Sequence, residues 1–288
     1  GKINNTLEGD EFRFELYKSD ASWNLGQLKE TVSNQAGGAF QFTKIDFTSA
    51  NDQYFIVKEV NAGQNIDGVT YDDTEFRVHV EVIDDLKGQL HTIVNIYDGN
   101  GVPQDSIQFT NIYEVTGTDK VILSGQKVVT GRQWAESDEF TFSLYKAGGD
   151  FSFQQDGENL VATKVVGYDT ANHGYQIQLD YTAQDVGKVF YYVLVEETGN
   201  IPGMTYDQTV YHITVAVRDD NQGGIETHTI VENASLDGLN FINVYAAAPT
   251  KITIEGGTWK NYPCAECDRT NLFLYVSHGG ELYIKGGY

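Results

Sequence analysis

The chain has 288 residues, which is enough for two or three domains that each have a hydrophobic core. Its formal net charge of −22 provides no basic surface for nucleic acid and disfavours adsorption to anionic membranes. No apolar stretch is long enough to span a bilayer, and neither a signal peptide nor an anchor is recognisable, so we expect a mature or trimmed fragment.

The composition predicts an all-β protein. Eighteen Tyr and 15 Phe accompany a single Met, and aromatic and β-branched residues favour strands. Thirty Gly and four Pro are typical of turns between short strands, and no amphipathic helix of useful length is recognisable.

Five segments occur twice in the same order, which indicates two tandem domains. The pairs are 11–17 and 139–145, 54–59 and 191–196, 68–74 and 203–209, 76–83 and 210–217, and 109–113 and 241–245. Their alternating strands and Gly/Asp/Asn turns predict immunoglobulin-like β-sandwiches at residues 1–116 and 117–247. The second copy carries an insertion at about residues 148–184.

Residues 248–288 are predicted to form a short β-rich tail. Segments 251–259 and 281–288 both end a strand-like run in Gly-Gly, which fits a hairpin or a truncated β-helix. A third alternative is that residues 252–259 act as a donor strand for the first domain of the next subunit. Cys264 and Cys267 are expected to form a small structural disulfide, with an unpaired role as the alternative.

The last strand of each repeat contains an unusual asparagine. Asn111 and Asn243 alternate with aromatic residues, so each should share the core face of its strand with them. A buried amide costs a few kcal/mol unless it is bonded. In the second repeat, Lys127 lies in the apolar first strand and Glu196 ends a Tyr-rich strand, and a sandwich can bring these two side chains to Asn243.

Such a cluster has a specific chemistry. Burial lowers the pKa of a lysine and raises that of a glutamate, so both can be neutral. The Lys127 amine can then attack the Asn243 side-chain carbonyl, with Glu196 hydrogen-bonding the amide oxygen and moving protons to the departing ammonia. Glu197 should point to the opposite face. The alternative is a backbone-bonded Asn beside an ordinary Lys–Glu ion pair.

The second repeat contains Lys-Val-Val-x-Gly-Arg, Glu-Phe-x-Phe-x-Leu, Tyr-x-Val-x-x-Glu, Gly-x-Thr-Tyr-Asp and Phe-x-Asn-x-Tyr. This combination resembles the pilin isopeptide-linkage domain of sortase-assembled Gram-positive pili. The resemblance implies a CnaB-like sandwich, a Lys127–Asn243 isopeptide bond and Glu196 as the assisting acid. It also implies an extracellular or cell-wall-attached structural shaft, with copies of itself, sortase and a host surface ligand as partners.

The first repeat matches this pattern less completely. Glu59 and Asn111 correspond to Glu196 and Asn243, and Lys2 is the lysine candidate upstream of residue 11. The apolar run that precedes Lys127 has no counterpart there, so either Lys2 or a strand from another molecule would complete this domain.

Two other functions are considered. The domains could be the stalk of an adhesin whose aromatic tail (Trp259, Tyr262, Tyr283 and Tyr288) binds a host ligand or glycan. An enzyme of another kind is disfavoured because no hydrolase, phosphate-loop or zinc motif occurs. No cofactor or metal is expected, and the acidic pairs 72–73 and 219–220 are interpreted as solvated turns rather than calcium sites.

Overall fold

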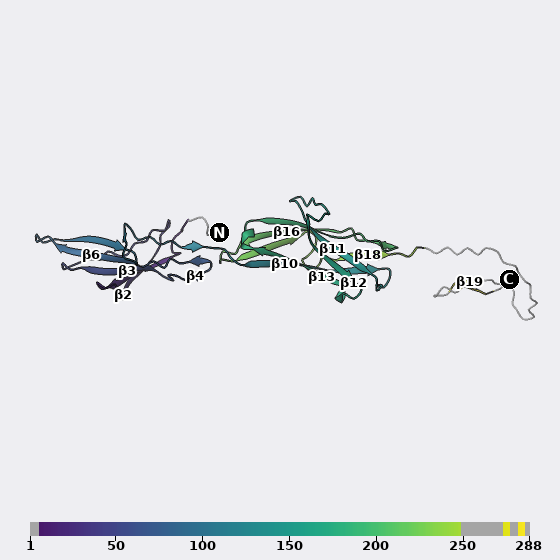
Figure 1. Cartoon of the computed structure of the whole chain (residues 1–288), viewed down its shortest axis with the longest axis horizontal. Coiled ribbons are helices and arrows are strands. Elements are labelled where there is room, and N and C mark those ends of the chain that lie inside the picture. Colours follow the sequence, from purple (N-terminus) through teal and green to yellow (C-terminus); the bar gives the residue numbers. More distant parts are fainter. Residues whose placement is uncertain (1–5, 249–272, 277–281, 286–288) are drawn as a thin grey trace, which may run out of the picture. The chain divides into compact units, whose positions relative to one another are not determined.

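A computed structural model describes residues 6–248, 273–276 and 282–285. Residues 1–246 form one compact unit and residues 247–288 a second, and each is described by itself. Figure 1 shows that the first unit is built from strands. In the described residues, helical structure is limited to the 3-10 turns η2 (Ala171–His173) and η3 (Ala183–Asp185).

The described part of the first repeat contains nine strands in two sheets. They are β1 (Arg13–Ser19), β2 (Leu25–Ser33), β3 (Gln53–Glu59), β4 (Asn65–Ile66), β5 (Val69–Thr70), β6 (Phe76–Asp84), β7 (Leu90–Tyr97), β8 (Pro103–Gln104) and β9 (Ile112–Tyr113). One sheet has the order β2-β1-β3-β6-β7-β8 and the other β4-β5-β9.

The second repeat has a larger second sheet. Its strands are β10 (Thr118–Thr130), β11 (Glu139–Lys146), β12 (Leu160–Gly167), β13 (Gly174–Thr182), β14 (Val189–Glu196), β15 (Met204–Thr205), β16 (Val210–Asp219), β17 (Ile225–Val231) and β18 (Phe241–Tyr245). The sheets have the orders β12-β11-β14-β16-β17 and β13-β10-β18-β15. The prediction of two tandem all-β sandwiches is therefore confirmed.

Period-two alternation builds the core of the second sandwich. Along β13, Tyr175, Ile177, Leu179 and Tyr181 are buried while the residues between them are exposed. Side chains from β10, β11, β14 and β16 pack against them, because successive strand residues point to opposite faces. This apolar core surrounds the second repeat's candidate site.

The two repeats differ in the strands that accompany their last strand, which is β9 in the first repeat and β18 in the second. The long first strand β10 pairs in parallel with β18 and antiparallel with β13, and β13 lies inside the predicted insertion. In the described part of the first repeat, no strand corresponds to β10 or β13. The second layer there consists of β4, β5 and β9.

In the tail, β19 (Phe273–Val276) pairs antiparallel with β20 (Leu282–Lys285). Segment 251–259, Cys264 and Cys267 lie outside the described residues. The tail alternatives, the predicted disulfide and the domain boundaries at 116 and 247 therefore stay predictions. Within the described ranges, no helix is both long and apolar enough to cross a lipid bilayer.

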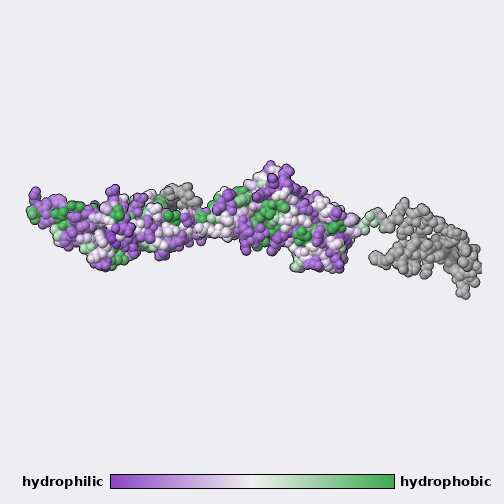
Figure 2. All heavy atoms as spheres, in the orientation of Figure 1, coloured by the Kyte–Doolittle hydropathy of each residue, from purple (hydrophilic) through white to green (hydrophobic). Residues whose placement is uncertain are grey.

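The visible surface mixes hydrophilic and hydrophobic residues. Figure 2 shows hydrophilic residues over much of this face of the first unit, with smaller hydrophobic groups among them. Single exposed apolar residues such as Leu86 and Val165 are normal on the surface of a folded domain.

Gly125 on β10 provides a test of this packing. A Cβ at this position would lie 1.8 Å from the carbonyl oxygen of Leu239. We expect Gly125→Ala to lower the free energy of unfolding of the second sandwich by about 3 kcal/mol or more, because the backbone has to shift. Urea-induced unfolding measures this, and Gly157→Ala, whose Cβ would meet nothing within 4 Å, is the matched control. Equal stability of the two variants would contradict the packing of β10 against the backbone at Leu239.

Candidate functional site

Asn243 lies on the core side of β18. Phe241 and Asn243 are fully buried, whereas Ile242 and Val244 are about half exposed, at 52% and 50%. The alternation predicted from the sequence is therefore confirmed, and it places a primary amide among aromatic rings. In the first repeat, Asn111 is partly buried between more exposed neighbours in the same pattern.

Lys127 and Glu196 reach Asn243 from two other strands. Lys127 lies on β10, which runs parallel to β18 and pairs Val129 with Asn243. Glu196 ends β14 in the opposing sheet. The side chains of Lys127 and Glu196 are completely shielded from solvent.

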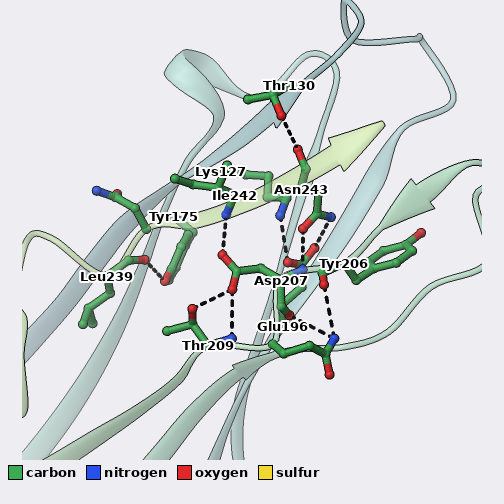
Figure 3. A network of polar contacts seen from close by, with 12 residues as sticks. Lys127, Thr130, Tyr175, Glu196, Tyr206, Asp207, Thr209, Leu239, Ile242 and Asn243 are labelled. Atoms are coloured by element: carbon green, nitrogen blue, oxygen red, sulfur yellow. Dashed lines mark hydrogen bonds and ion pairs between the residues drawn. The ribbon is translucent and has the colours of Figure 1, made fainter. Parts of the chain in front are cut away.

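The Glu196 carboxyl group connects the other two side chains (Figure 3). The Lys127 Nζ donates to Glu196 Oε2 at 2.7 Å, and the Asn243 Nδ2 donates to Glu196 Oε1 at 2.7 Å. The amine and the side-chain amide are thus held against the two oxygens of one carboxyl group. A carboxyl group held between an amine and an amide nitrogen can transfer protons between them.

The oxygen of the Asn243 amide has a different partner from the one expected. The backbone N–H of Asp207 donates to Asn243 Oδ1 at 2.8 Å, whereas Glu196 contacts the amide nitrogen. A backbone N–H can only donate, so this contact also fixes which end of the amide is the oxygen. The expected Glu196 hydrogen bond to the amide oxygen is therefore wrong for this arrangement.

Burial controls the ionisation of this cluster. Burial lowers the pKa of the Lys127 amine, against the opposing hydrogen bond and charge of Glu196. Burial likewise raises the pKa of the Glu196 carboxyl, against the opposing contacts of Lys127 and Asn243. Both pKa shifts favour the neutral forms of the two side chains. The Lys127 Nζ also lies 4.9 Å from the centre of the Phe140 ring.

The first repeat brings Glu59 and Asn111 together in the same way. The Asn111 Nδ2 donates to Glu59 Oε1 at 2.7 Å, and the Asp72 backbone N–H donates to Asn111 Oδ1 at 2.8 Å. Burial raises the pKa of Glu59. Glu59 Oε2 is buried and has no hydrogen-bond partner among the described residues. Lys2 lies outside the described residues.

A cavity of about 1110 Å³ borders this pair in the first repeat. Its lining includes Glu59 and Asn111 together with Phe14, Phe40 and Phe109. In the second repeat, β10 carries Lys127 alongside the equivalent Asn strand. Glu59, whose Oε2 has no hydrogen-bond partner among the described residues, thus lies on the wall of this cavity.

The remaining sequence predictions have separate outcomes. Glu197 accepts a hydrogen bond from Tyr145 Oη at 2.7 Å, which puts it away from the Glu196 cluster, as predicted. In the acidic turns, Asp219 accepts from Tyr113 Oη and Asp72 accepts from two backbone N–H groups. Asp72 is therefore part of the structure around Asn111 rather than a solvated turn residue.

Sequence reasoning missed the role of Asp72 and Asp207. A signal was present, because Thr-Tyr-Asp followed two residues later by Thr occurs in both repeats. What the sequence did not show is that each Asp backbone N–H meets the amide oxygen of the last strand.

The buried carboxyl predicts a pH dependence in a chain without the lysine. In Lys127→Met, the folded pKa of Glu196 stays above its ordinary value of 4.5 because burial is no longer opposed by the amine. A raised folded pKa gives stability that is present below pH 4.5 and lost as the pH rises through the folded pKa. We expect a loss of about 1.4 kcal/mol for each unit of pKa elevation.

Urea unfolding across a pH series measures this effect. The control is the double variant Lys127→Met/Glu196→Gln, which has no titrating carboxyl at this position. A stability difference between the two variants that does not change with pH would contradict the burial of Glu196.

Comparison with known proteins identifies the two repeats. The family model for FctA, described as the Spy0128-like isopeptide containing domain, matches residues 2–114 and 123–246. No curated protein matches the chain.

Among solved structures, the chain is similar to the major pilin from Streptococcus pyogenes, with 18% identity, coverage of 84% of this chain and 94% of that chain, and a TM-score of 0.30. It is also similar to the T-13 major pilin from the same species, at 19% identity, coverage of 83% and 89%, and a TM-score of 0.28. The pilus adhesin SpaC from Lactobacillus rhamnosus GG matches at 13% identity, coverage of 83% and 29%, and a TM-score of 0.24. Because the family model matches well over half of it, the chain belongs to the FctA family of Spy0128-like isopeptide-containing domains.

Proposed function

We propose that this chain is a structural subunit of a surface fibre whose domains are cross-linked by self-formed Lys–Asn isopeptide bonds. The observation that carries the proposal is the buried contact of Lys127 and Asn243 with the two oxygens of Glu196. Membership in a family of isopeptide-containing domains supports the same conclusion.

The proposed reaction consumes one amine and one amide. The neutral Lys127 Nζ adds to the Asn243 Cγ and forms a carbon–nitrogen bond. Glu196 Oε2 accepts a proton from Nζ, and a proton from the carboxyl group passes through Oε1 to the Asn243 Nδ2. The bond between Cγ and Nδ2 then breaks, and ammonia leaves. Each site reacts once, so the chain is not a turnover enzyme.

We propose the same bond between Lys2 and Asn111, with Glu59 as the acid. Three features support it. The family match begins at residue 2 and so includes Lys2. The contact between Glu59 and Asn111 repeats the geometry of the second site, and Glu59 Oε2 is buried without a partner among the described residues. A lysine amine is the group that this oxygen contacts in the second repeat.

The cross-link suits a protein that is exposed and under tension. It joins β10 and β18, the first and last strands of the second domain, and unlike a disulfide it is not broken by reduction. The proposed fibre role places the chain outside the cell or at the cell wall. Its partners would be copies of itself, with sortase as the joining enzyme.

The adhesin alternative has no specific observation in its favour. Trp259, Tyr262 and Tyr288 lie outside the described residues, and Tyr283 is part of β20. A host ligand is therefore not part of the proposal.

Intact mass of the denatured and reduced protein tests the bonds directly. We expect the chain to be lighter than its sequence mass by two molecules of ammonia, one for each repeat. Asn243→Ala and Glu196→Ala should each restore one ammonia, and Asn111→Ala the other. A matched control is Glu197→Ala, which removes the neighbouring carboxyl and should leave the mass deficit unchanged. A wild-type mass equal to that of the sequence would refute the proposal.

The bond should also stabilise the second domain. Closing a loop of about a hundred residues contributes roughly 4 to 5 kcal/mol in the chain-entropy model. Asn243→Ala should lower the free energy of unfolding in both the wild-type chain and a Glu196→Ala background. We expect the loss in the wild-type chain to be larger by about this contribution. The second background already lacks the bond, so the double-mutant comparison separates cross-linking from lost packing. Equal losses in both backgrounds would show that no cross-link contributes.

A further inference from the structure

The side-chain amide of Asn243 is contacted at both ends. Glu196 lies at the nitrogen, which departs, and the Asp207 backbone N–H lies at the oxygen. When an amine adds to the amide carbon, an electron pair moves onto this oxygen and gives it a negative charge. A fixed N–H donor at that oxygen lowers the barrier, as oxyanion-hole donors do in acyl transfer.

The Asp207 side chain fixes the position of that N–H. Its Oδ2 accepts from the backbone N–H of Ile242 at 2.6 Å, directly beside Asn243 (Figure 3). Its Oδ1 accepts from the Thr209 backbone N–H at 2.8 Å and from the Thr209 hydroxyl at 2.6 Å. The carboxylate therefore ties the turn between β15 and β16 to the strand that carries the reacting amide.

The first repeat contains the same set of backbone contacts. Asp72 donates its N–H to Asn111 Oδ1 at 2.8 Å and accepts from the backbone N–H groups of Thr110 at 2.6 Å and Thr74 at 2.8 Å. Thr110 precedes Asn111 as Ile242 precedes Asn243. The arrangement thus recurs in two domains that differ at the neighbouring turn position, which is Asp73 in one and Gln208 in the other.

The charge of Asp207 acts on both reacting partners. It raises the pKa of Lys127, which disfavours the neutral amine, and it raises the pKa of Glu196, which favours the protonated acid. The geometric benefit of a carboxylate at this position comes from its contacts with the backbone N–H groups of Ile242 and Thr209.

We propose that Asp207 is a positioning residue for isopeptide formation: its carboxylate holds its own backbone N–H on the amide oxygen of Asn243, where that N–H stabilises the developing oxyanion. Asp72 has the same role toward Asn111. This inference rests on the proposed function and adds an oxyanion site to the lysine, the glutamate and the asparagine.

The test follows the rate of bond formation in the second repeat alone. The chain is made by cell-free synthesis in an Asn111→Ala background, and samples are quenched in denaturant at intervals. Mass spectrometry of each sample measures the fraction that has lost one ammonia. Asp207→Ala removes the tether to Ile242, whereas Asp207→Asn leaves one acceptor oxygen for the two backbone N–H groups of Ile242 and Thr209. We expect both to slow the reaction at least about tenfold, approaching the roughly 100-fold effect of losing an oxyanion donor.

Two controls separate this role from folding. Thr209→Val removes the hydroxyl contact and keeps the tether to Ile242, so its rate should stay near that of the parent. The stability of each Asp207 variant is measured in a Glu196→Ala background, where no bond forms, and rates are compared where the domain is fully folded. If Asp207→Ala does not fold, Asp207→Asn decides the outcome.

A pH profile separates geometry from charge. The titratable groups that interact with Asp207 are Lys127, Glu196 and Tyr211. The reaction needs a neutral amine and a protonated acid, so its rate should pass through a maximum as the pH changes. A lower maximum rate, and not only a shift of the maximum along the pH axis, supports the oxyanion role. An unchanged maximum rate in folded Asp207 variants would overturn it. Failure of the parent chain to lose ammonia would instead refute the proposed function, and the two failures are thus distinguishable.

Discussion

The structure of the second domain depends on keeping three polar side chains inside an apolar core. Lys127, Glu196 and Asn243 are almost completely buried, and each would be costly there alone. Hydrogen bonds between them offset part of this cost, but a buried charge pair is a weak source of stability compared with well-packed apolar residues. The same burial favours the neutral amine and the protonated acid, so the environment that is unfavourable for an ion pair is favourable for the proposed covalent bond.

The two repeats show which parts of this arrangement belong together. In both, a Glu contacts the amide nitrogen of an Asn and an Asp backbone N–H contacts its oxygen, with the same distances of 2.7 and 2.8 Å. The amide is therefore held at both ends independently of the lysine. In the described part of the first repeat, the two contacts to the Asn111 amide are present without a lysine, and Glu59 Oε2 has no hydrogen-bond partner. An unpaired buried carboxyl oxygen is unfavourable, which gives a thermodynamic reason for a lysine-bearing segment to bind there.

Strand order explains how residues so far apart in sequence meet. Parallel pairing of β10 with β18 places the first and last strands of the second domain side by side, and β14 presents Glu196 from the opposing sheet. A cross-link between β10 and β18 joins the two ends of the domain and would keep it closed when the chain is pulled. The insertion contributes β13, which pairs with residues 118–126 of β10, directly before the segment 127–130 that pairs with β18.

The sequence by itself determined the tandem all-β organisation, because alternation and repeated turn motifs are local signals. It also indicated that Asn243 faces the core between aromatic residues, and that Lys127 and Glu196 are its partners. Only the tertiary structure decided which atoms meet. The assignment of Glu196 to the amide nitrogen and of the Asp207 N–H to the oxygen depends on how the turn between β15 and β16 packs against β18, and a backbone donor has no side-chain signature in a sequence. For the same reason Asp72 and Asp207 look like turn residues in the sequence, although in the fold their backbone N–H groups contact the side-chain amides of Asn111 and Asn243.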